Sequence, residues 1–167
     1  MIRAILFDFG DTLAMERGEF DRSMADQEFE KAPYVESVLR GLRRRFRLAV
    51  VSNTSTWRER EIRNALRRMG LERYFDAVVT SVDVGSPKPK AEIFQEALRR
   101  LGVEAHECMM VGDRTDADIL GGNRLGMETV HIDWQPHQEE TIDPELQKPD
   151  HTIRSLKELL ELIGPDG

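Results

Sequence analysis

Short apolar runs and amphipathic stretches alternate along the chain. The apolar runs are too short for helices and predict buried strands at residues 2–9, 48–51, 77–80, 107–111, 129–132 and 150–153. Between them, apolar residues recur every three or four positions, a spacing that predicts helices at residues 33–42, 57–69, 91–101, 116–125 and 156–163. Alternating strands and helices predict an α/β fold, in which a parallel sheet of five to six strands carries helices on both faces.

Two segments interrupt this alternation. Residues 13–32 are polar, mixed in charge and only weakly periodic. Residues 133–149 contain three prolines and are typical of a long loop. A length of 167 residues suits one hydrophobic core, so we predict a single domain over residues 1–167 that carries both segments.

The composition is that of a globular protein with a heavily charged surface, because 40% of the residues are hydrophobic and 33% are charged. The net charge of −7 gives no general attraction to nucleic acid, so no nucleic-acid partner is predicted. The single cysteine, Cys108, excludes an intrachain disulfide and fits a reducing cytoplasm. The apolar run before Asp8 is too short for a signal peptide, and no apolar stretch could span a membrane. We therefore expect a cytoplasmic protein without a membrane partner.

Polar side chains follow four of the predicted strands. Asp8 and Ser52 stand at the ends of the first two strands. Lys88 lies in the loop after the third strand, and Asp113 follows the fourth. The carboxyl ends of parallel strands share one edge of the sheet, where ligand sites form. Phosphoryl transfer needs such a set: a carboxylate that attacks phosphorus, a hydroxyl and an ammonium that bind phosphate oxygens, and a second carboxylate for Mg²⁺.

Four segments in this order resemble the four motifs of the haloacid dehalogenase superfamily. They are residues 8–12 (DFGDT), 50–53 (VVSN), 88–94 (KPKAEIF) and 111–119 (VGDRTDADI). Each motif is short, but four in the right order, each at a strand end, are highly specific. The resemblance covers most of residues 2–132 and implies a three-layer, Rossmann-like core.

The resemblance also implies a role for each matching residue. Asp8 would be the nucleophile that takes the phosphoryl group. Ser52 would bind phosphate through its hydroxyl and Asn53 through its backbone N–H. Lys88 would neutralise charge on Asp8 and on the phosphoryl group, and Thr12 would form a local hydrogen bond that fixes the first loop.

A Mg²⁺ ion is the cofactor that the resemblance implies. Its ligands would be the side chain of Asp8, the backbone carbonyl of Gly10 and the side chain of Asp113. Asp118 would support the metal site from the next layer of residues. The implied activity is a Mg²⁺-dependent phosphatase that hydrolyses a phosphomonoester through an aspartyl-phosphate on Asp8.

One position departs from the family pattern. Phosphatases of this superfamily usually carry a second aspartate two residues after the nucleophile, as general acid and base, and Gly10 stands there in this chain. Asp11 is one residue further along and is equally compatible with acid–base work and with a turn. Three interpretations stay open: Asp11 or a water transfers the proton, turnover is slow, or the chain is a binding or regulatory module without useful turnover. A positioned acid–base group contributes roughly 10²- to 10⁴-fold.

Caps decide substrate size in this superfamily, and here they are minimal. Residues 13–32 suffice for a short flap, and the chain between Ser52 and Lys88 is used up by one helix and one strand. We therefore expect an open crevice, covered either by a second copy in a homo-oligomer or by the substrate. That substrate would be phosphorylated, and either a small molecule or a macromolecule.

Several polar residues receive no catalytic role. The four histidines share no metal-ligand spacing, and Arg43-Arg44-Arg45 is typical of a solvated helix end. Asp116 suits the first turn of a helix, where negative charge is stabilised. Arg114 is equally compatible with substrate binding and with covering the sheet edge.

Overall fold

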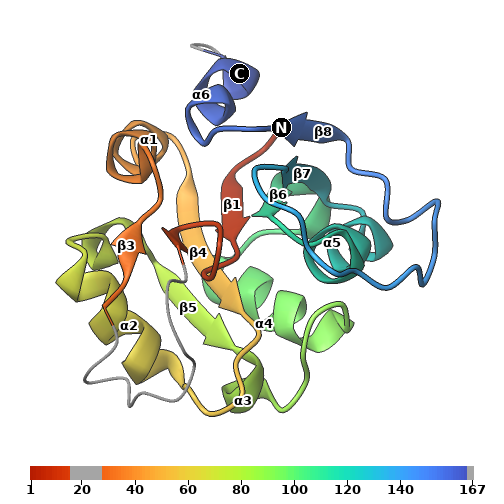
Figure 1. Ribbon diagram of the computed structural model, residues 1–167, viewed down its shortest axis with the longest axis horizontal. Coiled ribbons are helices and arrows are strands. Elements are labelled where there is room, and N and C mark those ends of the chain that lie inside the picture. Colours follow the sequence, from red (N-terminus) through yellow and green to blue (C-terminus); the bar gives the residue numbers. More distant parts are fainter. Residues whose placement is uncertain (16–27, 165–167) are drawn as a thin grey trace.

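The computed structural model of the chain describes residues 1–15 and 28–164. Its centre is a sheet of six parallel strands in the order β5-β4-β1-β6-β7-β8 (Figure 1). The strands are β1 (Ala4–Phe7), β4 (Arg47–Ser52), β5 (Ala77–Thr80), β6 (Cys108–Gly112), β7 (Glu128–Ile132) and β8 (His151–Ile153). The chain runs outward from β1 to β5, returns to the other side of β1 and continues to β8. This order creates a switch point beside β1, where parallel sheets bind ligands.

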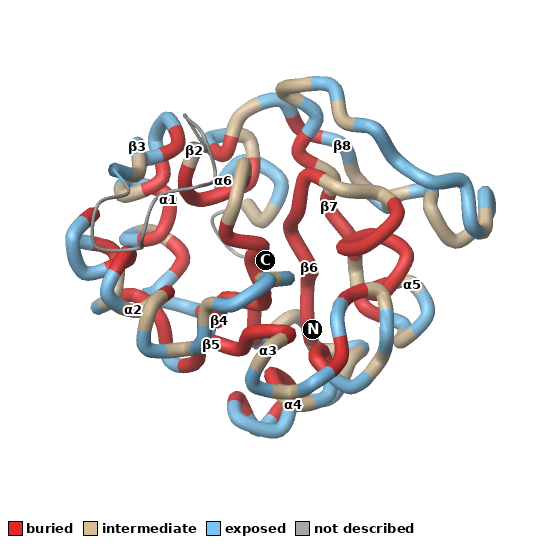
Figure 2. Tube along the Cα trace, turned by 60° about the horizontal axis from the view of Figure 1, so that its bottom comes forward, coloured by how far each residue is buried: buried red, intermediate tan, exposed pale blue. Residues whose placement is uncertain are grey.

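Helices cover both faces of the sheet because alternate residues of each buried strand point to opposite faces. The main helices are α1 (Val35–Leu42), α2 (Glu59–Arg68), α4 (Ala91–Leu101), α5 (Leu120–Leu125) and α6 (Lys157–Ile163). Helices α1, α2 and α6 pack on one face, against a core that includes Ile5 and Val50. Helix α4 packs on the other face, against Leu6 and Val51, with α5 beside it. Figure 2 shows the central strands, such as β1 and β6, buried, and exposed residues along the outer helices. The predicted three-layer α/β fold is confirmed.

Helix ends differ from prediction by a few residues. Helix α1 begins at Val35 rather than at Pro33, because Tyr34 takes a left-handed φ of 63° just before it. The helix predicted from residue 116 begins as a π-helical turn over Thr115–Ile119 and only then continues as α5. Wider turns of this kind are frequent at functional sites.

One short helix was not predicted. Helix α3 (Ser81–Val84) follows β5 directly, and the Thr80 hydroxyl accepts a hydrogen bond from the backbone N–H of Asp83 at 3.2 Å. Four residues are too few for apolar periodicity to appear. Two 3₁₀ turns, Glu72–Tyr74 and Ala105–Glu107, lead into β5 and β6.

The segment predicted as a flap is described only at its two ends. Strands β2 (Ala14–Met15) and β3 (Glu30–Lys31) pair antiparallel, and residues 16–27 between them lie outside the described part of the chain. Beside this pair, the ring of Phe29 packs edge-on against Phe9 at 5.4 Å and against Trp57 at 5.7 Å between centroids. These rings join the base of the segment to the residues that follow β1 and β4.

The long segment between β7 and β8 runs along the outside of the sheet, as the blue trace at the right of Figure 1 shows. Residues 133–150 form neither helix nor strand. Within the described ranges, no helix combines the length and the apolar character that crossing a membrane would need.

Candidate active site

A pocket of about 190 Å³ lies at the carboxyl ends of the central strands. Strand register explains its position, because Phe7 pairs with Val50 on β4 and with Val111 on β6, so Asp8 emerges level with the ends of both neighbours. The pocket contains every residue predicted for the site. Its lining is Asp8, Gly10, Asp11, Ser52, Asn53, Lys88, Asp113, Arg114, Ala117, Asp118 and His137.

Lys88 is the central cation of this pocket. Its Nζ donates hydrogen bonds to Asp8 Oδ1 at 2.8 Å, to Asp118 Oδ1 at 2.6 Å and to the carbonyl of Val51 at 2.8 Å. The side chain is only 2% exposed, so all three protons of the ammonium are used inside the protein. Burial disfavours the ammonium, but the charges of Asp118 and Asp8 outweigh it and raise the pKa of Lys88.

Three carboxylates surround this cation. Oxygens of Asp8, Asp113 and Asp118 all lie within 4.8 Å of one another. Burial, with the negative charge of Asp8 next, raises the pKa of Asp113 to about 10. Burial also raises the pKa of Asp118 to about 6, although Lys88 opposes the shift. One ammonium therefore does not balance the cluster, and oxygen donors in such a group fit a hard divalent cation such as Mg²⁺.

The Asp118 side chain is fixed in place by contacts within the protein. Both of its oxygens accept hydrogen bonds, Oδ1 from Lys88 and Oδ2 from the backbone N–H of Arg114 at 3.1 Å. It also packs against the bare backbone of Gly112, where a Cβ atom would stand 2.2 Å from Asp118 Cγ. Asp118 is therefore placed to orient Lys88 and to support the cation site.

The loop after β1 brings Asp11 to the pocket. Asp11 has a left-handed φ of 55°, and its backbone N–H donates to the carbonyl of Ala14 at 2.7 Å. Its carbonyl accepts a hydrogen bond from Trp134 Nε1 at 2.8 Å. Thr12 was predicted to bond locally within this loop, and its backbone N–H donates to the carbonyl of Phe9 at 3.4 Å. Its hydroxyl makes a further contact that was not predicted, since it donates across the sheet to Asp113 Oδ1 at 3.3 Å.

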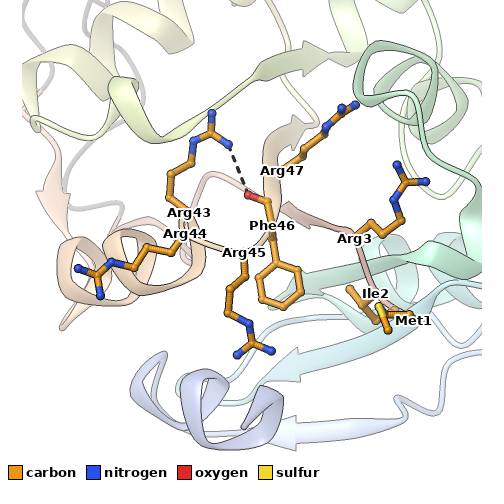
Figure 3. A pocket seen from close by; sticks show the side chains of 8 residues that line it. All are labelled: Met1, Ile2, Arg3, Arg43, Arg44, Arg45, Phe46 and Arg47. Carbon is orange, nitrogen blue, oxygen red and sulfur yellow. Dashed lines mark hydrogen bonds between the residues drawn. The ribbon is translucent and has the colours of Figure 1, made fainter. Parts of the chain in front are cut away.

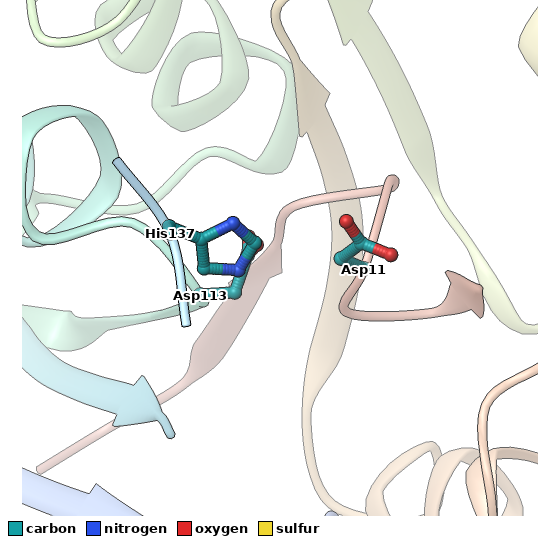
Figure 4. A group of neighbouring side chains, drawn as sticks. All are labelled: Asp11, Asp113 and His137. Carbon is teal, nitrogen blue, oxygen red and sulfur yellow. The ribbon is translucent and has the colours of Figure 1, made fainter. Parts of the chain in front are cut away.

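The loop after β7 adds a residue that the sequence did not indicate. His137 Nε2 lies 2.7 Å from Asp113 Oδ2, and its side chain is 16% exposed. Figure 4 shows the imidazole overlapping Asp113, with Asp11 across from them, and ligand atoms of the three residues lie within 4.8 Å of one another. His131, on β7, lies with Nε2 3.0 Å from the backbone carbonyl of Asp113. Histidine spacing carried no signal for either contact, because the loop after β7 brings His137 to Asp113 and the pairing of β6 with β7 brings His131 there.

The structure thus brings residues of all four motif segments into one pocket. The family described as haloacid dehalogenase-like hydrolase matches residues 15–132, which is more than half of the chain. The chain belongs to this family.

Relatives of this hydrolase-family chain include named phosphatases. A glyceraldehyde 3-phosphate phosphatase of Methanopyrus kandleri is 41% identical over 104 residues, which make up 59% of this chain and 42% of that protein. A ribulose-1,5-bisphosphate 5-phosphatase of Halopiger xanaduensis is 34% identical over 161 residues, 93% of this chain and 65% of that protein. The chain thus spans less than two thirds of the length of either. The crystal structure of a phosphatase of the same superfamily from Thermococcus onnurineus is similar with a TM-score of 0.78 at 25% identity, over 98% of each chain.

Asn53 contributes to the site in a way that the motif did not indicate. Its side-chain amide donates to the carbonyl of Lys88 at 3.0 Å and accepts from the backbone N–H of Lys88 at 2.8 Å. This two-way contact fixes the loop that carries the central cation. Its backbone N–H is the group predicted to bind phosphate, and Ser52 lines the pocket next to it.

Arg114, which lines the pocket, forms an ion pair with Asp116. The Arg114 guanidinium binds both oxygens of Asp116, at 3.0 and 2.8 Å, and Asp116 also accepts from the backbone N–H of Glu140. Asp116 is therefore structural, as its position in the first helical turn predicts. Arg114 lines the pocket while its charge is shared with Asp116.

A larger hollow of about 400 Å³ lies at the opposite edge of the sheet, where β1 and β4 begin. It is lined by Met1, Ile2, Arg3, Arg43, Arg44, Arg45, Phe46 and Arg47. Figure 3 shows the side chains of Arg43, Arg44 and Arg45 extending in three different directions. Arg43 binds Asp76 at 2.7 Å, and Arg3 binds Glu107 at 3.0 Å. Diverging cations that are partly paired within the chain do not make a reaction site, so the smaller pocket is the candidate active site of this hydrolase-family member.

Proposed function

We propose that this protein is a Mg²⁺-dependent phosphatase that hydrolyses a phosphomonoester through an aspartyl-phosphate on Asp8. The observation that carries the proposal is the contact of Lys88 Nζ with Asp8 Oδ1 inside a pocket that also holds Ser52 and Asn53. The buried ammonium holds this carboxylate in one orientation, as a nucleophile needs.

The proposed reaction has two steps. An oxygen of Asp8 attacks phosphorus, a new O–P bond forms, and the ester P–O bond breaks as the leaving oxygen takes a proton from the Asp11 carboxyl. Water then attacks phosphorus and gives a proton back to Asp11, the Asp8 O–P bond breaks, and inorganic phosphate leaves with the Asp8 carboxylate restored. Lys88 holds the other oxygen of Asp8 throughout and offsets the negative charge of the phosphoryl group.

The donor set of the pocket supports the metal in this proposal. Asp8, Asp113 and the carbonyl of Gly10 are the proposed ligands, and Asp118 is the proposed support. When bound there, Mg²⁺ would neutralise charge on the phosphoryl oxygens. Burial, and next the negative charge of Asp8, raise the pKa of Asp113 to about 10, and a bound cation would offset both effects.

The pocket is too small to enclose a whole substrate. About 190 Å³ is below the 300–1,000 Å³ of pockets that enclose a drug-sized ligand. The phosphoryl group would occupy the pocket and the rest of the substrate would lie outside it. This fits a phosphorylated small molecule or macromolecule that itself covers the crevice, or a second copy of the chain that does so.

The test is phosphate release from an aryl phosphate, with and without Mg²⁺. We expect turnover only with Mg²⁺, and loss of turnover to background in Asp8→Asn, which removes the nucleophile but keeps its size. Asp133→Asn is the matched control, because Asp133 is exposed and directly follows β7, and it should keep the wild-type rate. Turnover that survives in Asp8→Asn would overturn the aspartyl-phosphate mechanism.

Proton transfer is assigned to Asp11, and Asp11→Asn tests it. Asparagine tolerates the left-handed φ of 55° at this position, so the loop should keep its shape. We expect kcat to fall about 10²- to 10⁴-fold, the usual contribution of a positioned acid–base group. Steady-state kinetics and the slope of kcat against pH measure it. An unchanged kcat would leave the proton to a water molecule.

Gly10 favours a second candidate function. Without a carboxylate at that position, the chain would be a binding or regulatory module that keeps the fold and the metal site. Gly10→Asp separates the two candidates in the same aryl phosphate assay. An inert wild type with an active Gly10→Asp variant would support the module, and an active wild type would support the phosphatase.

A further inference from the structure

The loop after β7 brings a nitrogen donor to the carboxylates, and we propose that His137 is a further ligand of the bound metal ion. A site with this imidazole would favour Mn²⁺ or Co²⁺ over Mg²⁺ more strongly than a site of oxygen donors alone. The inference rests on the proposed metal site at Asp8 and Asp113, and it assigns a role that the sequence motifs do not contain.

The position of the imidazole carries the inference. Donor atoms of His137, Asp11 and Asp113 all lie within 4.8 Å of one another (Figure 4). His137 Nε2 is buried and lies 2.7 Å from Asp113 Oδ2. This is a close ion-pair contact, and Nε2 makes no hydrogen bond among the described residues. Buried polar atoms are nearly always satisfied, and a cation shared with Asp113 would satisfy this one.

Hydrogen bonds anchor the loop on both sides of His137, and they restrict the position of its imidazole. Before it, Trp134 Nε1 donates to the carbonyl of Asp11 at 2.8 Å. After it, the Glu139 carboxylate accepts from the backbone N–H and the hydroxyl of Thr115, at 2.8 and 2.6 Å. The first anchor lies on the loop after β1, and the second lies on the π-helical turn after β6. Both elements also carry proposed metal-site residues.

Ligand chemistry gives the inference its measurable consequence. Mg²⁺ prefers oxygen donors in octahedral geometry and keeps several waters, whereas imidazole is a good ligand for first-row transition metals. Removing one nitrogen donor should therefore weaken transition-metal binding more than Mg²⁺ binding. A histidine that only neighbours Asp113 would not discriminate between the ions.

The experiment measures the binding of Mg²⁺, Mn²⁺ and Co²⁺ to the metal-free protein by titration calorimetry. We expect His137→Ala to weaken Co²⁺ and Mn²⁺ about tenfold or more and to change Mg²⁺ by about twofold or less. The visible absorption of bound Co²⁺ should shift as a nitrogen ligand is lost. His106→Ala is the matched control, since His106 is exposed in the turn before β6, and it should change none of these values.

Equal weakening of all three ions, or no change with any ion, would overturn the inference. His137→Gln, which keeps a polar side chain, gives the same comparison if the alanine variant does not fold. The Asp113→Asn variant shows whether the His137 inference alone is wrong or the proposed metal site is wrong as well. If Asp113→Asn binds all three ions like the wild type, the proposed metal site itself is wrong, whatever His137 does.

Discussion

Replacing Lys88 by methionine is expected to remove about 3–5 kcal/mol from the free energy of unfolding, the cost of breaking a buried ion pair by deleting one partner. Methionine fills a similar volume, so the loss is one of charge and hydrogen bonds. Asp8, Asp118 and the carbonyl of Val51 each lose a donor at 2.6 to 2.8 Å. Turnover should fall to background in the same variant, because the proposed nucleophile loses its orienting cation.

The stability loss in Lys88→Met should depend on pH. The pKa of Asp118 is already raised to about 6 by burial, and removing the cation that opposes this shift raises it further. A carboxyl whose pKa is higher in the folded than in the unfolded state binds more protons when folded, so stability falls as pH rises between the two values. The unfolded value is about 4. The deficit should therefore be smallest near pH 4 and grow toward pH 8.

Urea unfolding with a chelator present measures this deficit, since a bound cation would partly replace the lost ammonium. Lys90→Met is the matched control, because Lys90 is exposed two residues away on the same loop. It should change stability by no more than about 0.5 kcal/mol, as surface substitutions do. A Lys88→Met variant with wild-type stability at pH 8 would contradict the buried-pair account of the site.

Gly112→Ala is expected to cost about 3 kcal/mol, the upper end of the range for overpacking a core. The added Cβ would stand 2.2 Å from Cγ and Oδ2 of Asp118, far inside contact distance. Asp118 is not free to retreat, because Lys88 holds Oδ1 and the backbone N–H of Arg114 holds Oδ2. Relief of the clash must therefore break the Lys88–Asp118 contact, and catalysis should fail together with stability.

Gly41→Ala provides the contrast for this prediction. Gly41 lies inside α1, where a Cβ would meet only the flexible end of Leu160 at 3.1 Å. Alanine is the better helix former by about 1 kcal/mol, so this variant should be neutral or stabilised. Urea unfolding measures the free energy of unfolding of both variants, provided that the m-value is unchanged, and the aryl phosphate assay measures their turnover. Equal behaviour of the two would show that Asp118 does not depend on the bare backbone of Gly112.

The part of the site that strand ends determine was predictable from the sequence. Asp8, Ser52 and Asp113 follow buried apolar runs, and parallel strands must end at one edge of the sheet, so their proximity follows from the fold class. Lys88 was predictable only through its motif, because the short helix α3 and the turn after it were not visible in the periodicity. A helix of four residues leaves no repeat to detect.

The contribution of the long loop was not predictable. No repeating pattern describes residues 133–149, and hydrogen bonds to distant parts of the chain, such as those of Trp134 with Asp11 and of Glu139 with Thr115, hold the loop in place. These contacts place His137 beside Asp113. Thr12 illustrates the same limit, since its partner stands 101 positions away in the sequence. Periodicity predicts the helices and strands and the sheet edge where a site forms, whereas contacts between distant residues depend on the tertiary structure.

The two tryptophans of the chain stand at different parts of this arrangement. Trp134 is hydrogen-bonded to the loop that carries Asp11, and Trp57 packs edge-on against Phe29 at the base of the β2–β3 pair. Replacing either one leaves a single tryptophan, whose emission can be excited apart from that of the two tyrosines. Emission from Trp134 would then report events at the carboxylate cluster, and emission from Trp57 would report events beside β3. The protein thus contains two optical probes with which the arrival of a substrate can be timed without an attached dye.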